Sequence, residues 1–400
     1  MYFSNQSKKQ SKKNAAPKQQ NHVCPKCSFE NYHAALYCEI CFYPLNIVQY
    51  KPPTVTSIVP QSEVLETETK SNLQQEFQKP SVISGLLVLG LAIALWSNYL
   101  LDRQVTHLSL NEEESIALYD SMSQVEDVPP GLFSYGGALY FASLVAHGMN
   151  DAISQDHPNF HLRYTKPANQ DQSYAHGIKM LLDGELSFAF NSRPLTNQEY
   201  VQAELRNLKL LQVPIAIDGL TVFGNRDLKV NNLSVDQVKD IFSGKITNWR
   251  QLGGADLPIT PVLLTPEDLE ILAIRDPNAL PSSTQYAANY TLAVRKVIAM
   301  PGAISLASTS LIQNQQGIKP FSLAAENSAN YVAPLLQKQP NLDLFKNGTY
   351  PLTRRLFLVI RQDGTPEDLA GKAYAQMLLS QQGQSIVEDS GFVPLYNTKI

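Results

Sequence analysis

The sequence predicts an α/β domain that follows a small cysteine-rich unit and one membrane-spanning helix. From about residue 129 onward, apolar strand-like runs alternate with amphipathic stretches, the pattern of strands interleaved with helices. All four cysteines fall between residues 24 and 41. An uncharged apolar run then separates them from a long remainder without cysteine. These observations divide the chain into parts of different chemistry.

Composition describes an ordinary globular chain rather than a polycation. Its 400 residues carry a formal net charge of −4, and 17% of them are charged, so the length suits about two or three folded units. The first twenty residues contain lysines and no acid. Because this leader is polar and poor in apolar residues, we expect residues 1–22 to be disordered.

The cysteines form two CxxC pairs, Cys24-x2-Cys27 and Cys38-x2-Cys41. Two such knuckles complete a tetrahedral four-thiolate site for Zn²⁺, and the stretch 23–46 resembles a small zinc ribbon. A closed four-thiolate site leaves no position for substrate, so the zinc is expected to be structural. The alternatives are a redox CxxC pair, which would need a thioredoxin-like setting, or two disulfides.

Zinc ribbons dock on other macromolecules, and the neighbouring lysines would favour an acidic surface. We therefore expect a cytoplasmic protein or nucleic-acid partner for the ribbon. The other interpretation is that the lysines only set membrane topology and bind anionic lipid. The sequence does not separate the two.

The run Val82–Leu101 contains no charged side chain. About 20 apolar residues span the hydrocarbon core of a bilayer, so we expect a transmembrane helix over 81–101. A buried core helix would show a polar face, and a signal peptide would stand at the N-terminus. The flanking segments are expected to be a linker, 47–80, and a stalk, 102–128.

Lysines precede this run, whereas Arg103 is the only close cation after it. The positive-inside rule then places the N-terminus in the cytoplasm and the C-terminal domain outside it. The expected location is thus the inner or plasma membrane, crossed once, with the large domain periplasmic or otherwise extracytoplasmic.

Within the large domain the periodicity predicts individual elements. Ser234 is a good N-cap for a helix that ends at Phe242. The other expected elements are helices over Ala142–Ile153 and Gly177–Asp183, and strands over Leu186–Phe190 and Leu210–Ile217, the latter followed by Asp218-Gly219.

Several motifs of this domain resemble the PstS-like phosphate-binding proteins of ABC transporters. They are VPIAIDGLTVFGN, LSVDQVKDIFSGKITNWRQLGG, MPGAISLAS, and a late pattern of YPLTRRLFLVIRQDG, a helix and GFVPL. The resemblance covers roughly residues 129–397 and implies a two-lobed type II periplasmic-binding-protein fold. Its lobes would be 129–214 with 306–400, and 215–305, within a domain of 129–400. Ligand would bind in a hinged cleft between them.

The resemblance also implies where a phosphate would bind. In the first lobe, the turn that opens the first helix offers the backbone amides of Leu139 and Tyr140. Ser173 matches a serine before a glycine-containing helix. Ser192 and Arg193 match a polar pair before Pro-Leu. Helix N-termini, hydroxyls and an arginine are the groups that hold a phosphate.

The element expected from the second lobe departs from the family pattern. After the strand PITPV the family has an Arg and a Ser-Gly-Thr, whereas this chain reads Leu264-Thr265-Pro266-Glu267-Asp268. Because charge-assisted hydrogen bonds contribute about 1.5–3 kcal/mol each, their loss predicts weak or absent phosphate binding. Glu267 and Asp268 are better read as caps of the helix that they open.

Two functions follow from this pattern. The first is a sensor or interaction module with a degenerate phosphate cleft. The alternative is a functional binding protein for phosphate, or another small anion, in an ABC transport system. No catalytic grouping, metal-spaced His/acid set or P-loop stands out, so we do not expect an enzyme.

Overall fold

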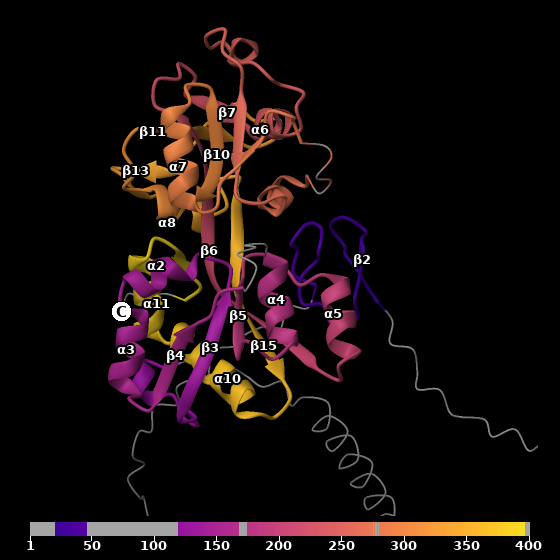
Figure 1. Ribbon diagram of the computed structural model, residues 1–400, viewed down its shortest axis with the longest axis vertical. Helices are drawn as coiled ribbons and strands as arrows, with labels where there is room; N and C mark the ends of the chain where they lie inside the picture. The colour runs from indigo at the N-terminus through magenta and orange to yellow at the C-terminus, as the bar shows by residue number, and fades with distance from the viewer. Residues whose placement is uncertain are drawn as a thin grey trace, which may run out of the picture. The chain divides into compact units, whose positions relative to one another are not determined.

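The computed structural model describes residues 21–45, 119–167, 174–274, 276, 278 and 280–396. The expected linker, the membrane helix, Ser173, and most of the leader and stalk lie outside these residues. The described chain forms the predicted α/β fold with two lobes, joined by the long strands β6 (Lys209–Asn225) and β15 (Thr353–Gln362), as Figure 1 shows.

The first lobe is built on strands in the order β4-β3-β5-β15-β6. β3 (Gly131–Gly137) lies parallel to β4 (Phe160–Tyr164) on one side and to β5 (Phe188–Asn191) on the other. All of β5 is buried, as expected for a strand covered on both faces. The helices of this lobe are α2 (Phe141–Ala146), α3 (Met149–Asp156), α4 (Tyr174–Leu182), α5 (Asn197–Glu204), α10 (Pro366–Leu379) and α11 (Gln381–Asp389).

Some predicted elements of this lobe differ in detail. The expected helix Ala142–Ile153 is two helices, because Gly148 adopts a left-handed φ of 87° between α2 and α3. The domain also begins before residue 129. Met122 is buried, and its backbone N–H donates to Gln382 Oε1 at 2.8 Å, so the end of the expected stalk packs in the first lobe.

Strand β6 serves both lobes. It pairs with β15 from Lys209 to Gly219 and with β10 (Ala303–Ser308) from Leu220 to Gly224. The predicted strand therefore continues through Asp218-Gly219. A side chain at Gly219 would meet the ring of Phe345 at 2.3 Å, so only glycine lets the strand pass this ring.

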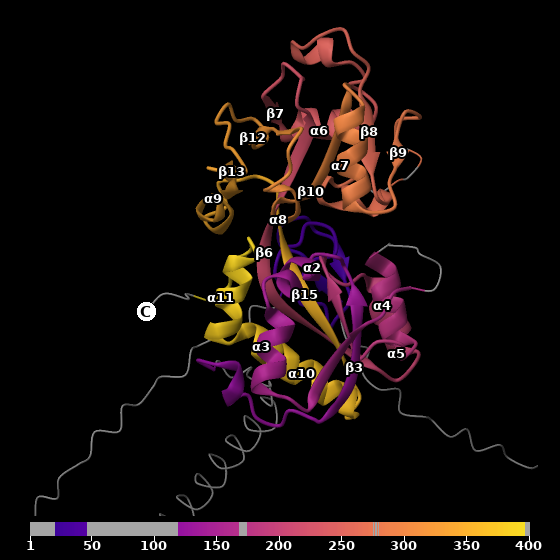
Figure 2. The ribbon, with the colours of Figure 1, turned by 60° about the vertical axis from the view of Figure 1, so that its left-hand side comes forward.

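The second lobe continues the sheet through β10, β8 (Thr260–Leu263) and β9 (Gln285–Tyr286) (Figure 2). Helix α6 (Val235–Phe242) is confirmed with its capping box, in which Ser234 Oγ accepts from Gln237 N at 3.1 Å. Its apolar side packs into the core that contains Trp249. The lobe also holds α7 (Tyr290–Ala299), α8 (Thr309–Ile312), α9 (Leu342–Lys346) and the 3₁₀ helices η2 (Trp249–Leu252) and η3 (Pro266–Leu272).

The division between the lobes differs from the expected boundary at 305/306. β11 (Ile318–Pro320) pairs with the second-lobe part of β6, and β12 (Ser322–Ala324) pairs with β7 (Asn232–Ser234). Leu323, Phe345 and Tyr350 share one core with Trp249. The second lobe therefore extends to β15, where the chain returns to the first.

The cysteine ribbon folds as two knuckles with a short antiparallel pair, β1 (His22–Val23) and β2 (Glu30–Asn31). It packs against the first lobe, and Ala35 is buried in a core shared with Tyr200 and Ala203 of α5. The Tyr32 ring stacks on the Tyr200 ring with centroids 5.1 Å apart. The Tyr32 hydroxyl donates to Glu204 Oε2 at 2.6 Å. The ribbon and the domain thus form one compact unit.

The predicted localisation is corrected by the structure. Among the described residues, no helix is long and apolar enough to cross a membrane, and the run Val82–Leu101 lies outside them. The ribbon packs on the domain through buried contacts. A single crossing between the two would separate these groups by a bilayer, so the single-pass arrangement with the ribbon in the cytoplasm is wrong.

Candidate anion cleft and metal centre

Four predicted site residues of the first lobe follow the ends of the parallel strands β3 and β5, namely Leu139, Tyr140, Ser192 and Arg193. Ala138 N donates to Phe190 O at 2.8 Å, which sets the turn of Leu139 and Tyr140 beside Ser192 and Arg193. The carboxyl ends of parallel strands are where ligands bind in open α/β sheets. Helix α4 approaches the same edge, because a side chain at Gly177 would lie 2.6 Å from Gly137 Cα.

Tyr140 has a structural side chain. It is buried, and its hydroxyl donates to Phe357 O at 2.7 Å. Burial raises the pKa of this phenol well above its ordinary value. Only the backbone amides of Leu139 and Tyr140 could therefore contribute to an anion site. That role, and the role of Ser173, which lies outside the described residues, remain predictions.

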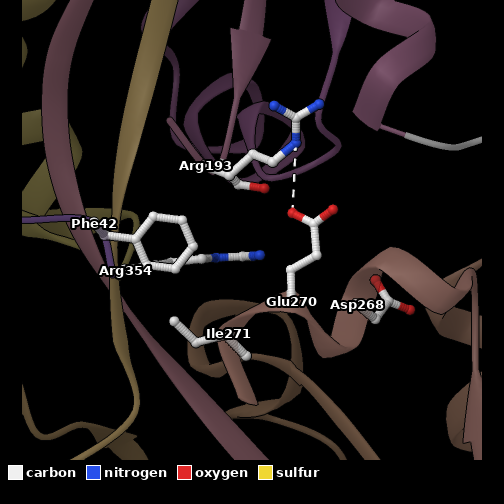
Figure 3. Close-up of a pocket in the computed structure, with 7 residues that line it drawn as sticks. Phe42, Arg193, Asp268, Glu270, Ile271 and Arg354 are labelled. Atoms are coloured by element: carbon white, nitrogen blue, oxygen red, sulfur yellow. Dashed lines mark ion pairs between the residues drawn. The ribbon is translucent and has the colours of Figure 1, made fainter. Parts of the chain in front are cut away.

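A cavity lies between the lobes and holds the remaining predicted residues, Ser192 and Arg193 (Figure 3). Its volume is about 20 Å³, which is room for about one water molecule. A bound phosphate would need the lining side chains to move. These are Phe42 from the ribbon, Ser192 and Arg193 from the first lobe, Arg354 from β15, and Asp268, Glu270 and Ile271 from η3.

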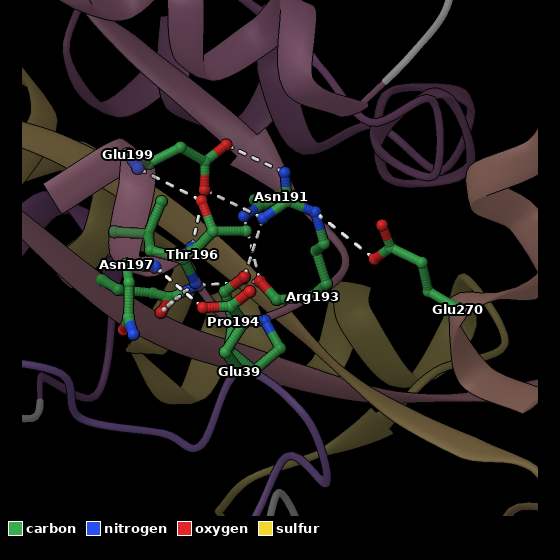
Figure 4. A network of polar contacts seen from close by, with 10 residues as sticks. Glu39, Asn191, Arg193, Pro194, Thr196, Asn197, Glu199 and Glu270 are labelled. Carbon is green, nitrogen blue, oxygen red and sulfur yellow. Dashed lines mark hydrogen bonds and ion pairs between the residues drawn. The ribbon is translucent and has the colours of Figure 1, made fainter. Parts of the chain in front are cut away.

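Arg193 is held by carboxylates from two directions. It is only 8% exposed, and its two terminal nitrogens donate to Glu199 at 2.9 and 2.8 Å. Across the cleft, its Nε lies 3.6 Å from Glu270 Oε2 (Figure 4). Burial lowers the pKa of this guanidinium, but the carboxylates outweigh it and the pKa is raised.

The Nε–H of Arg193 has no hydrogen-bond partner among the described residues, because 3.6 Å is beyond hydrogen-bond range. Buried donors are nearly always satisfied, and leaving one unpaired costs about 1–3 kcal/mol. An oxygen within hydrogen-bond distance of Arg193 Nε, from a water molecule or from an anion that displaces Glu270, would satisfy this donor.

Arg354 is a second cation of the cleft that the motif comparison missed. Its Nε and Nη2 each lie 3.1 Å from Asp218 Oδ2. Asp218 is fully buried and also accepts from the Ser308 hydroxyl at 2.7 Å. The Arg354-Arg355 pair at the start of an apolar strand was visible in the sequence, but only the pairing of β15 with β6 aims it at the cleft.

On the second lobe, the expected cap is confirmed for Asp268. Its Oδ2 accepts from the backbone amides of Leu264 at 2.8 Å and Thr265 at 3.1 Å. These amides thus already serve a carboxylate. Glu270, two residues further along η3, carried no sequence signal of its role. It reaches Arg193 only because the lobes face each other.

The four cysteines come together as predicted. Their sulfur atoms all lie within 4.8 Å of one another, with Cys24–Cys41 and Cys27–Cys38 each at 3.5 Å. Bonds of about 2.3 Å in a tetrahedron place sulfurs about 3.8 Å apart, so the set fits one metal ion. Burial raises the pKa of the Cys24 thiol, but backbone hydrogen bonds from Cys27 and Lys26 bring it down to about 7.

Comparison with known proteins agrees with this fold. A sequence model described as a PBP superfamily domain matches residues 134–382. "Phosphate-binding protein PstS" of Staphylococcus haemolyticus is 25% identical over 259 residues, which is 62% of this chain and 77% of that protein. The protein of the same name from Staphylococcus epidermidis is 24% identical over 62% of this chain and 74% of its own.

Solved structures show the same architecture. A substrate-binding protein from Clostridium perfringens, solved with bound phosphate, superposes with a TM-score of 0.55 at 23% identity, covering 66% of this chain and all (100%) of its own. An ABC-type phosphate transport receptor from Vibrio cholerae gives a TM-score of 0.51 at 20% identity, covering 65% and 99%. Because both identities are below 25%, this likeness shows a shared fold alone.

Proposed function

The chain belongs to the PBP superfamily, and we propose on this premise that its inter-lobe cleft binds phosphate or another small anion with low affinity. The observation that carries the proposal is the buried Nε–H of Arg193, which faces the cavity without a hydrogen-bond partner among the described residues. The relatives named as phosphate-binding proteins support the class of ligand.

Low affinity follows from the carboxylates already present. Glu199 holds one side of the Arg193 guanidinium, and Glu270 stands where an anion would approach the other. An incoming phosphate must displace or protonate Glu270, and the repulsion between like charges opposes it. Each charge-assisted hydrogen bond forgone costs about 1.5–3 kcal/mol, so losing two weakens binding by about 10²-fold or more.

Such a cleft suits a sensor better than a delivery protein. The Arg193–Glu270 pair already links the lobes, so ligand would exchange one inter-lobe contact for another. A ligand shifts the equilibrium between the ion-paired cleft and the ligand-bound cleft only by the difference between its affinities for these two states. The response would therefore occur at high anion concentration. The second candidate, a tight-binding protein of a phosphate ABC transporter, is favoured by the names of the relatives.

Isothermal titration of the full chain with inorganic phosphate separates these functions. We expect a dissociation constant above about 10 µM, and loss of binding in Arg193→Ala. Arg250→Ala, which removes an exposed guanidinium paired with Asp256, should leave binding unchanged. A submicromolar constant would favour the transport function. Binding that is identical in wild type and Arg193→Ala would place the ligand elsewhere.

For the cysteine cluster, we propose structural Zn²⁺ bound by Cys24, Cys27, Cys38 and Cys41. The distances among the four sulfurs support a tetrahedral thiolate site. Such a site gives the ion no open position for substrate, so its role is to hold the ribbon folded.

A further inference from the structure

Among the described residues of the ribbon, Phe42 lines the cavity between the lobes. This residue follows the second knuckle directly after Cys41, and its ring lines the cavity together with Arg193 and Arg354. Figure 3 shows the ring beside Arg354, with Ile271 of η3 nearby. A residue from the N-terminal metal-binding unit is therefore part of the cleft wall.

The two knuckles of the ribbon have the same backbone geometry at Ser28 and Phe42. These two residues therefore differ in their side chains and surroundings. Ser28 N donates to Cys24 O at 2.8 Å, and Phe42 N donates to Cys38 O at 3.0 Å. Both residues are left-handed, with φ of 60° and 58°. Ser28 is exposed, whereas Phe42 is half-buried against the cleft.

A phenylalanine is an unusual choice for this conformation. Left-handed φ suits glycine or asparagine, and a bulky residue there is an outlier. Backbone strain of this kind persists only where the surroundings over-determine it. The knuckle, closed by the proposed metal ion, would supply that constraint and fix the direction of the ring.

The knuckle is also tied to the helix that positions the cleft arginine. Glu39, between Cys38 and Cys41, accepts from Asn197 N at 2.9 Å at the first residue of α5. Two residues further along α5, Glu199 holds the Arg193 guanidinium. The metal site, α5 and the cleft cation therefore form one continuous set of contacts.

We propose that the ribbon is a third wall of the ligand cleft, in which Phe42 limits the space beside Arg193 and Arg354 and metal occupancy keeps it there. Phe42 then determines ligand size and weakens anion binding, and metal and anion oppose each other. This inference rests on the proposed anion cleft. Because coupling between two binding affinities is reciprocal, phosphate should also weaken zinc binding.

The test compares Phe42→Gly with Ser28→Gly, the same substitution at the equivalent position of the other knuckle. Both are made in the full chain and in the Glu270→Gln variant, in which phosphate binding is expected to be tighter. Metal content and thermal unfolding first establish that each variant is folded. Titration with inorganic phosphate, and with a phosphate monoester as a larger probe, then measures the cleft.

We expect Phe42→Gly to lower the phosphate dissociation constant at least about fivefold and to lower that of the monoester further, with no change for Ser28→Gly. Removing zinc from the wild type with a chelator should shift phosphate binding in the same direction. Phosphate should lower the zinc affinity, measured by equilibrium competition with a chromogenic chelator, in the wild type but not in Phe42→Gly.

Two results overturn the inference and are distinguishable. If Glu270→Gln binds phosphate and Phe42→Gly leaves that affinity equal or weaker, the ribbon does not restrict the cleft, while the proposed function stands. If no variant binds either probe, the anion cleft itself is refuted, and the inference fails with it.

Discussion

Arg193 of the first lobe and Glu270 of the second lobe face each other across the cleft, with Nε and Oε2 3.6 Å apart. The carboxylate thus stands where an anionic ligand would bridge the lobes. Under the proposed function, Glu270 would compete with the anion for Arg193, and this pair would limit the affinity that a ligand can reach.

Substituting Glu270 should tighten anion binding. In Glu270→Gln the opposing charge is removed while the side chain keeps its size, so we expect the phosphate dissociation constant to fall about tenfold or more, since one charge-assisted contact is worth 1.5–3 kcal/mol. Titration calorimetry measures it. Glu326→Gln, which breaks an exposed pair with Lys239 in the same lobe, is the control. Unchanged or weaker affinity in Glu270→Gln would contradict the competitor role.

Arg354 should be essential to stability as well as to the cleft. It pairs with Asp218, which is fully buried. Arg354→Met would leave that carboxylate without its cation, and breaking a buried pair in this way costs about 3–5 kcal/mol. Urea unfolding measures the change. Arg250→Met, at an exposed pair, should change stability by no more than about 1 kcal/mol. Equal losses of unfolding free energy in the two variants would mean that the buried pair stabilises the protein no more than the exposed one.

Zinc should protect all the thiols of the chain. The four cysteines are the only ones in the sequence, and Cys27 is exposed, so a metal-free ribbon would react readily with a thiol reagent. We expect one zinc per chain by elemental analysis and slow labelling until a chelator is added. Cys38→Ser should bind zinc far more weakly. Rapid labelling of zinc-loaded protein would argue against a four-thiolate site.

Docking of the ribbon should depend on Tyr32. Its ring stacks on Tyr200 and its hydroxyl donates to Glu204, while burial and this hydrogen bond raise its pKa to about 12. Tyr32→Ala should release the ribbon and speed limited proteolysis within residues 21–45. Tyr43→Ala removes an exposed aromatic of the same ribbon and serves as the control. Equal cleavage rates in the two variants would show that the Tyr32 contacts do not hold the ribbon.

The sequence by itself determined the features that depend on local chemistry. The CxxC spacing placed four sulfurs around one point. Ser234 and Gln237 formed the capping box of α6, and Asp268 capped the start of η3. The motifs of the domain led to the two-lobed fold. Each of these follows from residues a few positions apart, or from a pattern that many sequences share.

Only the tertiary structure decided what the parts do to one another. The pairing of Arg193 with Glu270, the aim of Arg354 at the cleft and the docking of the ribbon through Tyr32 join residues far apart in the chain. The uncharged apolar run Val82–Leu101, which suggested a ribbon separated from the domain by a membrane, carries no information on such contacts. They arise when the lobes and the ribbon bury their surfaces together, so that the ribbon and both lobes line one cavity.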